Sequence, residues 1–347
     1  MVDALRSRVE VVGGVVPSVS RPFDLWNKAT HVHRDRDTWR ARAFFNGARF
    51  RALSENAAVR LSELPPHDVV LHVYPVLCEP PGRAPYVVLT DNTMAITQRA
   101  FRRWANLSRR ETAASIVRER DLFRRAAFVA TFGSQARASA IDDYGCDPDR
   151  VVTVGVATYL PAETPDRAEG KEVLFVATSF WRKGGATLLE AWATVVAQVP
   201  DAQLTIVGPR HAPPTGMPAN IRWLGPKTSE ELRLFYSDAN VFVLPTLFES
   251  SLPNVIREAM AHGLPVVASD VAAIATDSPP EILLFPPDDA EALAARLLML
   301  LRDPAEARAR GLRLREVSLR DFTWDGQAGR IAALLERAAG EEPRGGG

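Results

Sequence analysis

The sequence has few cysteines and no apolar run long enough to span a membrane. Its 347 residues include two cysteines, Cys78 and Cys146, which are too few and too isolated for a disulfide framework or a zinc site, so we expect plain buried thiols. No apolar stretch approaches the roughly 18–20 residues of a transmembrane helix. The opening residues, MVDALRSRVE, do not form a signal peptide. These absences favour a cytoplasmic protein.

Lysine is also scarce, and neither sign of charge is in excess over the whole chain. The 42 basic side chains match 42 acidic ones, and four of the basic ones are lysines: Lys28, Lys171, Lys183 and Lys227. Residues 1–150 hold 23 basic and 17 acidic residues, a net charge of +6, so the remainder carries −6. A basic first half favours an anionic partner, such as a lipid headgroup or a phosphorylated acceptor. A solvated, arginine-rich surface would give the same balance.

A dinucleotide-binding fingerprint is missing as well. The pattern G-x-G-x-x-G follows none of the predicted strands, which argues against a nicotinamide-dependent oxidoreductase. The chain instead alternates short apolar runs with helical stretches, and this alternation implies an α/β protein with parallel sheets. The predicted strands are 9–12, 68–74, 86–90, 127–132, 151–154, 173–178, 203–207, 221–224, 242–245, 264–268 and 282–285.

The length of the chain predicts two domains, because 347 residues exceed the usual size of a single hydrophobic core. A stretch rich in proline, glycine and charge separates the two sets of strands and is predicted to be the linker. In chain order we expect a first domain at 1–160, the linker at 161–171, a second domain at 172–323, a helix that crosses back to the first domain at 324–339, and a disordered tail at 340–347.

Two histidines lie in a polar stretch of the first domain. Residues 17–37 are predicted to form a loop that holds His31 and His33, and residues 37–64 a single helix. The H-x-H pattern is compatible with a metal, but no further His, Cys or carboxylate motif with ligand spacing accompanies it. No metal site is therefore expected.

A helix predicted over 95–125 carries nine arginines, interleaved with Phe101, Trp104 and Leu107. Basic and aromatic residues on one helix are typical of docking to a membrane surface, so peripheral contact of residues 99–125 with the inner face of the membrane is one hypothesis. A domain helix with a solvated arginine face is the other. No nucleic-acid-binding motif accompanies the charge, so nucleic acid is not expected as a partner.

The most informative stretch is FVLPTLFESSLPNVIREAMAHGLPVVAS, residues 242–269. A buried strand leads into a polar loop that holds Glu249, and a helix that begins near Pro253 carries Glu258 and ends at Gly263. Free backbone N–H groups at the start of this helix favour an anionic ligand. Two carboxylates would repel a bare phosphate, but they accept hydrogen bonds from sugar hydroxyls. The combination therefore suggests a sugar nucleotide as the ligand.

This stretch resembles the donor-binding domain of the retaining family-4 (group 1) glycosyltransferases, which have the GT-B fold. Their signature is a glutamate, seven residues and a second glutamate that opens EAMA-x-G-x-PVVAS, and EAMAHGLPVVAS over 258–269 matches it closely. Here eight residues separate Glu249 from Glu258, and the family's glycine pair is absent. The resemblance implies that Glu258 holds the ribose hydroxyls and Glu249 those of the donor sugar. It implies that the intervening loop and helix start also bind the donor, through Ser250, Ser251, Leu252, Pro253 and Asn254.

A second loop, residues 179–185, carries the positive charges that the resemblance requires. In the family an arginine and, five residues later, a lysine before glycine neutralise the donor diphosphate. Lys183 matches the lysine, whereas Thr178 occupies the position of the arginine. Arg182 is the candidate substitute for that arginine.

Residues at three other strand ends complete the predicted site. Gly208 and Gly225 end strands of the second domain and are expected to contact the donor nucleotide. Asp91 follows a strand of the first domain, where the family often has a histidine beside the reacting sugar. It is expected to orient the acceptor hydroxyl or to stabilise positive charge on the donor sugar, with a turn or cap aspartate as the alternative. The resemblance covers residues 126–338 well and 1–125 loosely, because no glycine-rich loop follows a first strand.

The sequence therefore predicts a metal-independent, retaining glycosyltransferase without a cofactor, built from two Rossmann-like domains that face each other across a cleft. Its donor is a nucleoside-diphosphate sugar, with UDP and GDP as candidates, and its predicted catalytic residues are Lys183, Glu249 and Asp91. The acceptor is a hydroxyl group of a glycan, a lipid-linked molecule or a small molecule.

Three other functions fit part of the sequence. A catalytically silent sugar-nucleotide-binding protein fits Thr178 and the unclear first strand. A sugar-nucleotide epimerase shares the architecture, but its acid and base side chains are not identifiable. A membrane-peripheral scaffold fits the arginine-rich stretch alone.

Overall fold

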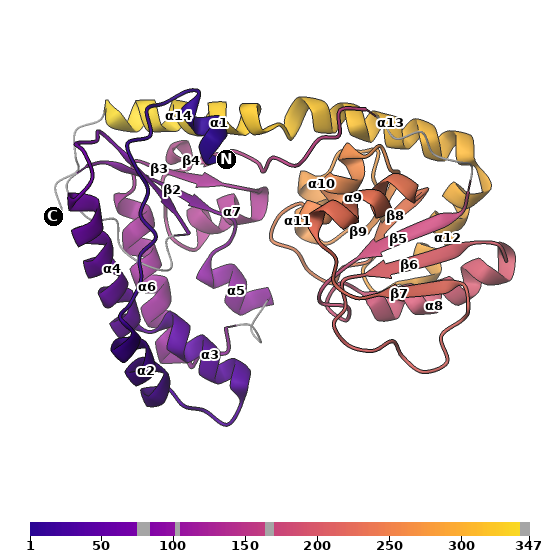
Figure 1. Cartoon of the computed structure of the whole chain (residues 1–347), viewed down its shortest axis with the longest axis horizontal. Coiled ribbons are helices and arrows are strands. Elements are labelled where there is room, and N and C mark those ends of the chain that lie inside the picture. The colour runs from indigo at the N-terminus through magenta and orange to yellow at the C-terminus, as the bar shows by residue number, and fades with distance from the viewer. Residues whose placement is uncertain (75–83, 101–104, 164–169, 341–347) are drawn as a thin grey trace. The chain divides into compact units, whose positions relative to one another are not determined.

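The computed structural model of the chain divides into two compact units (Figure 1). The first comprises Met1–Val156 and Trp324–Gly347, and the second Ala157–Thr323. Cys78, the aromatic residues Phe101 and Trp104, most of the predicted linker and nearly all of the predicted tail lie outside the residues that the structure describes. Those described residues are 1–74, 84–100, 105–163 and 170–340.

The first unit is built on a four-stranded parallel sheet with the strand order β1-β2-β3-β4. Alternate residues of its strands face opposite sides, as the pleat requires. Val87 and Phe128 pack with α14 (Trp324–Ala339) on one face, whereas Val88 and Val129 pack with α6 (Arg109–Arg125) and α7 (Ser134–Asp142) on the other. The strands are β1 (Val70–Val73), β2 (Tyr86–Thr90), β3 (Phe128–Thr131) and β4 (Val151–Thr153).

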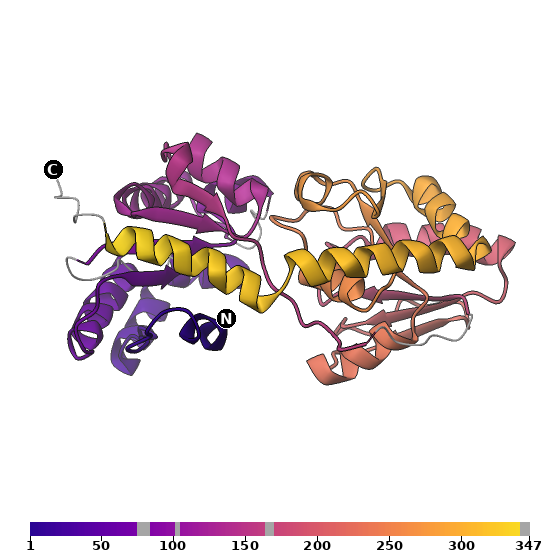
Figure 2. The ribbon, with the colours of Figure 1, turned by 90° about the horizontal axis from the view of Figure 1, so that it is seen from above.

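Helices cover both faces of this sheet (Figure 2). α14 belongs to the first unit although it comes last in the chain, and it packs Ile331 and Leu335 on the sheet beside Leu5 of α1. The helical elements of the unit are α1 (Val2–Arg6), α2 (Arg21–Thr30), α3 (Arg36–Phe45), α4 (Gly47–Ser62), α5 (Met94–Ala100), α6 (Arg109–Arg125), α7 (Ser134–Asp142), the 3₁₀ turn η1 (Pro148–Arg150) and α14 (Trp324–Ala339).

Two of the helices predicted for this unit are each divided by a capping residue. The predicted helix 37–64 is interrupted at Asn46, whose backbone is extended and whose side chain accepts a hydrogen bond from the Arg49 N–H at 2.9 Å. The predicted helix 95–125 is interrupted before α6, where Ser108 and Glu111 form a capping box. One side chain caps the new helix at Asn46, and two side chains cap each other's backbone N–H groups at Ser108 and Glu111.

Two other predictions for the first unit were wrong. Residues 9–12 do not form a strand, and Val9 packs at the edge of the core without a strand partner. The predicted loop 17–37 contains α2, which begins after Ser20 with a proline in its first turn. The Ser20 hydroxyl accepts the hydrogen bond of the Phe23 N–H at the start of this helix.

The second unit has a six-stranded parallel sheet with the order β10-β9-β8-β5-β6-β7. In chain order this is the doubly wound arrangement, in which the direction of winding reverses between β5 and β8. Its strands are β5 (Glu172–Val176), β6 (Gln203–Val207), β7 (Ile221–Leu224), β8 (Val241–Leu244), β9 (Val266–Ser269) and β10 (Leu283–Phe285). Most of β5, β6, β8 and β9 is fully buried, which explains why they were recognised as continuous apolar runs.

One continuous apolar core joins this sheet to its helices. Phe175 and Phe242 at its centre are fully buried, and each such side chain contributes roughly 1.5–3 kcal/mol of transfer free energy. The helices are α8 (Gly185–Gln198), α9 (Ser229–Asp238), α10 (Asn254–Ala261), α11 (Ala272–Asp277), α12 (Ala290–Arg302) and α13 (Pro304–Asp321).

α13 holds the C-terminal end of α10. A Cβ atom on Gly311 would lie 2.1 Å from the Gly263 carbonyl oxygen, so the two backbones touch where only glycine fits. The Arg315 guanidinium donates hydrogen bonds to the Ala261 carbonyl and, at 2.8 Å, to the Pro161 carbonyl. Residues at the beginning of the predicted linker are therefore fastened to the second unit, and the division between the units falls earlier, at Val156 and Ala157.

Candidate functional site

The loops that follow β5 and β8 meet at the carboxyl edge of the second sheet. Gly184 has a φ of +76°, and a Cβ atom there would lie 1.7 Å from the Pro245 carbonyl oxygen, so this contact requires glycine. The Leu247 N–H donates to the Arg182 carbonyl at 3.1 Å, which fixes the second loop against the first. Ligands of doubly wound sheets bind at this reversal of strand order.

Three of the predicted charged residues come together in these loops. Lys183 Nζ donates a hydrogen bond to Glu249 Oε1, and Arg182 Nη1 lies 3.6 Å from the same oxygen. The Thr246 hydroxyl also donates to Glu249 Oε1, at 2.7 Å. The Lys183 and Glu249 side chains are only 14% and 11% exposed, so two cations share one largely buried carboxylate. The cluster keeps an excess of positive charge.

Burial affects the protonation of Lys183. It lowers the pKa of the amine below its usual value, because removal of water disfavours the charged form, while the Glu249 carboxylate acts in the opposite direction. The ion pair with Glu249 is thus the main interaction that keeps this amine charged.

The start of α10 lies directly after the second loop. Pro253 is its N-cap, and none of the described side chains caps it. Leu252 and Pro253 are buried, Ser250 and Ser251 are half-buried, and Asn254 is exposed. An uncapped helix N-terminus presents backbone N–H groups and a partial positive charge to an anion.

Glu258 lies one turn further along α10 and is held by a residue that the sequence did not identify. The Tyr236 hydroxyl of α9 donates to Glu258 Oε2 at 2.9 Å, and the tyrosine is 1% exposed. Burial raises the pKa of Glu258, while the Tyr236 hydrogen bond and the charges of Arg257 and Arg233 lower it. Tyr236 and Glu258 are 22 residues apart, and no local pattern links them.

Gly208 and Gly225 lie next to each other at the ends of β6 and β7. The Gly208 N–H donates to the carbonyls of Leu224 and Gly225, both at 3.2 Å, and its φ is +112°. A Cβ atom on Gly208 would lie 2.8 Å from the Ala177 carbonyl oxygen, so this turn packs on the end of β5.

An aromatic cluster that the sequence did not predict joins the loop after β5 to β7 and to the segment after β6. The rings of Trp181 and His211 are parallel within 8°, and Phe180 and Trp223 contact His211 from other sides. Trp181 is 60% exposed and directly precedes Arg182 in the loop after β5.

Asp91 lies in the first unit, after β2. It is half-buried, and burial raises the pKa of its carboxyl group. Burial raises the pKa of Tyr74, which follows the neighbouring strand β1, and the nearby Asp91 charge raises it further. The structure thus places Asp91 at the carboxyl edge of the first sheet and the Lys183–Glu249 pair at the carboxyl edge of the second.

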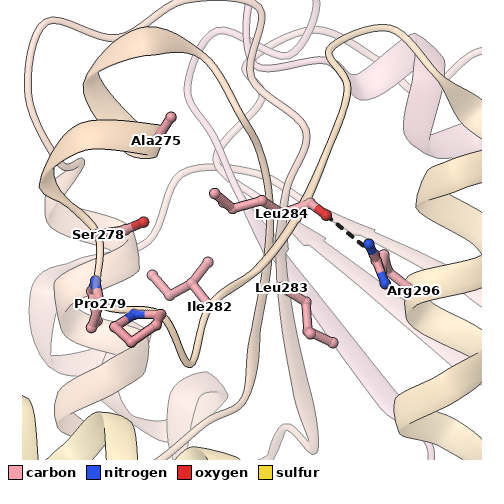
Figure 3. A pocket seen from close by; sticks show the side chains of 8 residues that line it. Ala275, Ser278, Pro279, Ile282, Leu283, Leu284 and Arg296 are labelled. Carbon is pink, nitrogen blue, oxygen red and sulfur yellow. Dashed lines mark hydrogen bonds between the residues drawn. The ribbon is translucent and has the colours of Figure 1, made fainter.

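A recess of about 470 Å³ lies elsewhere in the second unit (Figure 3). Pro279, Pro280 and Ile282 line it, and Arg296 closes one side by donating to the Leu284 carbonyl at 3.1 Å. These residues lead into β10 at its amino end, whereas Lys183 and Glu249 follow the carboxyl ends of parallel strands. The recess is therefore not part of the charged site.

The arginines of α5 and α6 are partly engaged within the first unit. Arg99 forms two hydrogen bonds of 2.7 Å with Asp143, and Arg118 donates to the Phe45 carbonyl at 2.9 Å. Arg109 and Arg110, at the start of α6, are exposed. Part of the arginine-rich stretch is thus structural.

Within the described ranges, no three His, Cys, Asp or Glu side chains are grouped so as to hold a metal ion. His31 Nδ1 lies 2.8 Å from the Asn27 carbonyl, and His33 Nδ1 accepts from the Asp35 N–H, so both rings make local contacts. Cys146 is a buried free thiol whose pKa burial raises to about 11. Among the described helices, none combines the length and apolar character needed to cross a bilayer.

Comparisons with known proteins agree on the character of the second unit. A family model described as glycosyl transferases group 1 matches residues 170–303. The D-inositol 3-phosphate glycosyltransferase of Corynebacterium efficiens is 29% identical over 290 residues, which cover 75% of this chain and 68% of that protein. The phosphatidyl-myo-inositol mannosyltransferase of Mycobacterium tuberculosis is 34% identical over 184 residues, 50% of this chain and 48% of that protein. The match thus spans about half of the mycobacterial relative.

A solved structure matches both units. The sucrose-phosphate synthase of Thermosynechococcus elongatus superposes with a TM-score of 0.63 over 83% of this chain and 77% of that one. Its sequence identity is 22%, so the likeness concerns the fold.

Proposed function

We propose that this chain, whose residues 170–303 match the group 1 glycosyl transferases and whose fold is that of the GT-B glycosyltransferases, moves a sugar from a nucleoside-diphosphate sugar to a hydroxyl group with retention of configuration. The observation that carries this proposal is the Lys183–Arg182–Glu249 cluster beside the uncapped start of α10. Positive charge, free backbone donors and a carboxylate lie in adjoining loops at one edge of the sheet, and a phosphate joined to a sugar needs all three.

In the proposed reaction the bond between the sugar and the terminal phosphate breaks, and its electron pair passes to the phosphate oxygen. Lys183, Arg182 and the N–H groups at the start of α10 stabilise the negative charge that develops on the leaving diphosphate. The acceptor oxygen then forms the new bond on the face that the phosphate leaves, and its proton passes to the departing phosphate. These groups lie on the protein itself, so we propose that no metal ion or cofactor takes part.

The two glutamates are assigned to hydroxyl groups of the donor. Glu258, held by Tyr236, receives the ribose hydroxyls, and Glu249 receives those of the transferred sugar. Both carboxylates are largely withdrawn from water, which strengthens charge-assisted hydrogen bonds to a ligand. Gly208 and Gly225 leave room for the nucleotide at the neighbouring strand ends.

The acceptor is the less constrained partner. The names of the two relatives mention an inositol phosphate and a phosphatidylinositol, and the first half of this chain is basic. We therefore propose a hydroxyl acceptor that carries a phosphate, either free or as part of a lipid headgroup, with Asp91 orienting it. We propose a cytoplasmic protein, and if it contacts the inner face of the membrane, we assign the contact to exposed arginines of α6 such as Arg109 and Arg110.

The first experiment is thermal stabilisation by a panel of UDP-, GDP- and ADP-sugars, with Glu258→Ala as the matched variant. A ligand at one hundred times its Kd contributes about 2.7 kcal/mol, which for a unit of this size corresponds to roughly 5–10 °C in Tm. We expect one nucleotide class to stabilise the wild type and not the variant. No shift with any of the three classes would contradict the proposal.

Product analysis then separates the remaining functions. A transferase releases nucleoside diphosphate only when a hydroxyl acceptor is present, and the anomeric configuration of the product reports retention. An epimerase releases nucleoside diphosphate or an altered sugar without an acceptor, and a silent binding protein shows stabilisation without turnover.

A further inference from the structure

Arg257, the fourth residue of α10, is a buried cation that the mechanism above does not use. The residue is 3% exposed, and no carboxylate in the described part of the chain forms an ion pair with its guanidinium. Burial lowers its pKa to about 10, while the charges of Glu258 and Asp277 act in the opposite direction. A cation in the first turn also opposes the helix dipole. The burial of this charge and its position in the first turn both destabilise the folded protein without ligand, so we expect an interaction that offsets their cost.

The contacts of the guanidinium indicate what that role is. One Nη atom donates to the Leu252 carbonyl and the other to Asn254 Oδ1, whereas Nε has no partner among the described residues. The two acceptors lie on either side of Pro253, so the guanidinium bridges the turn that leads from the donor loop into α10. The planar fork of arginine suits two such acceptors, and lysine offers a single point of contact.

The bridge also explains why the helix start is open. Asn254 is the first residue of α10, and its side-chain oxygen is an acceptor close to the free N–H groups. Arg257 occupies that oxygen, and Pro253 provides none at the N-cap position. The N–H groups therefore stay available, and a second positive charge lies beneath them.

We propose that Arg257 is a positioning residue for the donor diphosphate: it fixes the Leu252–Asn254 turn, keeps the N-terminus of α10 uncapped, and adds its buried charge to the field that the phosphates meet. This inference rests on the proposed function. It assigns the diphosphate, as distinct from the base or the sugar, as the part of the donor that Arg257 serves.

The direct test compares the ligand affinities of Arg257→Met and the wild type. Binding of GDP and UDP is measured by titration, and binding of the nucleosides guanosine and uridine is measured by saturation-transfer NMR. We expect the variant to bind the stabilising nucleoside diphosphate at least tenfold more weakly and the corresponding nucleoside within twofold of the wild type. The donor KM should rise while kcat changes less than threefold. Arg257→Lys, which keeps the charge but loses one contact, should recover part of the affinity.

A matched control is Arg310→Met on α13. Arg310 also donates to a backbone carbonyl, that of Glu281 at 2.9 Å, and is largely buried, but it lies outside the donor loops. We expect this variant to lose stability without a change in diphosphate affinity. Equal losses of diphosphate and nucleoside binding in Arg257→Met would overturn the inference and leave a structural role for the arginine.

If Arg257→Met does not fold, a second variant tests the positioning role of Arg257. Asn254→Asp places a carboxylate beside the Arg257 guanidinium and at the N-terminus of α10. Because the new charge pairs with Arg257 and with the helix dipole, we expect a higher Tm of the free protein and weaker diphosphate binding. If Asn254→Asp binds the diphosphate with the affinity of the wild type, the proposal is wrong. If the wild type itself binds no nucleoside diphosphate, the proposed function fails first, and the inference fails with it.

Discussion

Replacing Lys183 by methionine removes one positive charge from the loop after β5 and keeps the length of the side chain. The Lys183 side chain is 14% exposed and its amine contacts Glu249, so the substitution leaves the Glu249 side chain, which is 11% exposed, with Arg182 and Thr246 as its partners. Breaking a fully buried ion pair costs about 3–5 kcal/mol. Because two partners remain, we expect a smaller loss of stability, roughly 1–3 kcal/mol.

The effect on catalysis should be larger than the effect on stability. Removal of one donor that stabilises developing negative charge lowers kcat by roughly 10²–10³, or about 3–4 kcal/mol in activation free energy. We expect this loss in Lys183→Met, measured as release of nucleoside diphosphate in the presence of acceptor, with a smaller change in donor KM. A variant that folds and keeps wild-type kcat would refute the role of Lys183.

Glu249→Gln is the complementary variant, because it leaves Lys183 in place without its counter-charge. Two unit charges 4 Å apart interact by about 4 kcal/mol at an effective dielectric constant of 20, and one third of that energy corresponds to roughly a tenfold change in affinity. We therefore expect tighter binding of the free nucleoside diphosphate by calorimetry, together with slower transfer. Weaker binding of both the diphosphate and the intact donor would mean that Glu249 acts only as a structural partner of Lys183.

Three further variants test other parts of the structure. Burial raises the pKa of Glu119 from an unfolded value near 4.5 to about 7. Between these two pH values the folded protein keeps a proton that the unfolded chain releases. The free energy of unfolding should therefore fall by roughly 3 kcal/mol as the pH rises from 4.5 to 7. Urea denaturation should show this slope in the wild type and lose it in Glu119→Gln, and parallel curves would contradict the assignment. Gly184→Ala places a Cβ atom on the Pro245 carbonyl at a positive φ, so we expect at least about 2 kcal/mol of destabilisation in thermal melts and a raised donor KM. Tyr236→Phe leaves Glu258 without its hydroxyl donor, and we expect donor KM to rise roughly tenfold with kcat nearly unchanged, an equal loss in kcat being the contrary result.

The sequence predicted the strands of both sheets well because parallel strands are buried on both faces. Largely apolar runs such as 86–90 and 203–207 need no tertiary information to be recognised, and β2 and β6 have those bounds. The run 9–12 is equally β-branched, but a strand exists only where a neighbour completes its hydrogen bonds, and no sequence pattern supplies that neighbour. Helix ends depend on single capping side chains, and Asn46 and Ser108 were not recognised as caps inside longer helical patterns.

The candidate site shows the same division between local and tertiary information. Lys183 and Glu249 were predicted because each stands in a motif near a strand end, and the fold brings the two side chains into contact. Tyr236 was not predicted because its contact with Glu258 joins two helices, and no pattern in a single sequence shows that these two residues are in contact. Arg257 lies three residues after Asn254, a spacing that places both on one face of a helix, but only the structure shows that the arginine is buried.

The ion pair between Lys183 and Glu249 affects how the proposed donor would bind. Lys183 has little access to water and needs a counter-charge, and among the described residues Glu249 is the carboxylate that supplies it, while the more exposed Arg182 lies 3.6 Å from the same carboxylate. A diphosphate carries more negative charge than one carboxylate, so its arrival at the cations weakens their hold on Glu249. The released carboxylate keeps the hydrogen bond from Thr246 but has free acceptor capacity in a water-poor site, and in the proposed function the hydroxyl groups of the attached sugar use that capacity. The proposed function therefore predicts that the diphosphate and the sugar are recognised in a coupled manner, since the carboxylate assigned to the sugar becomes available when the phosphates bind.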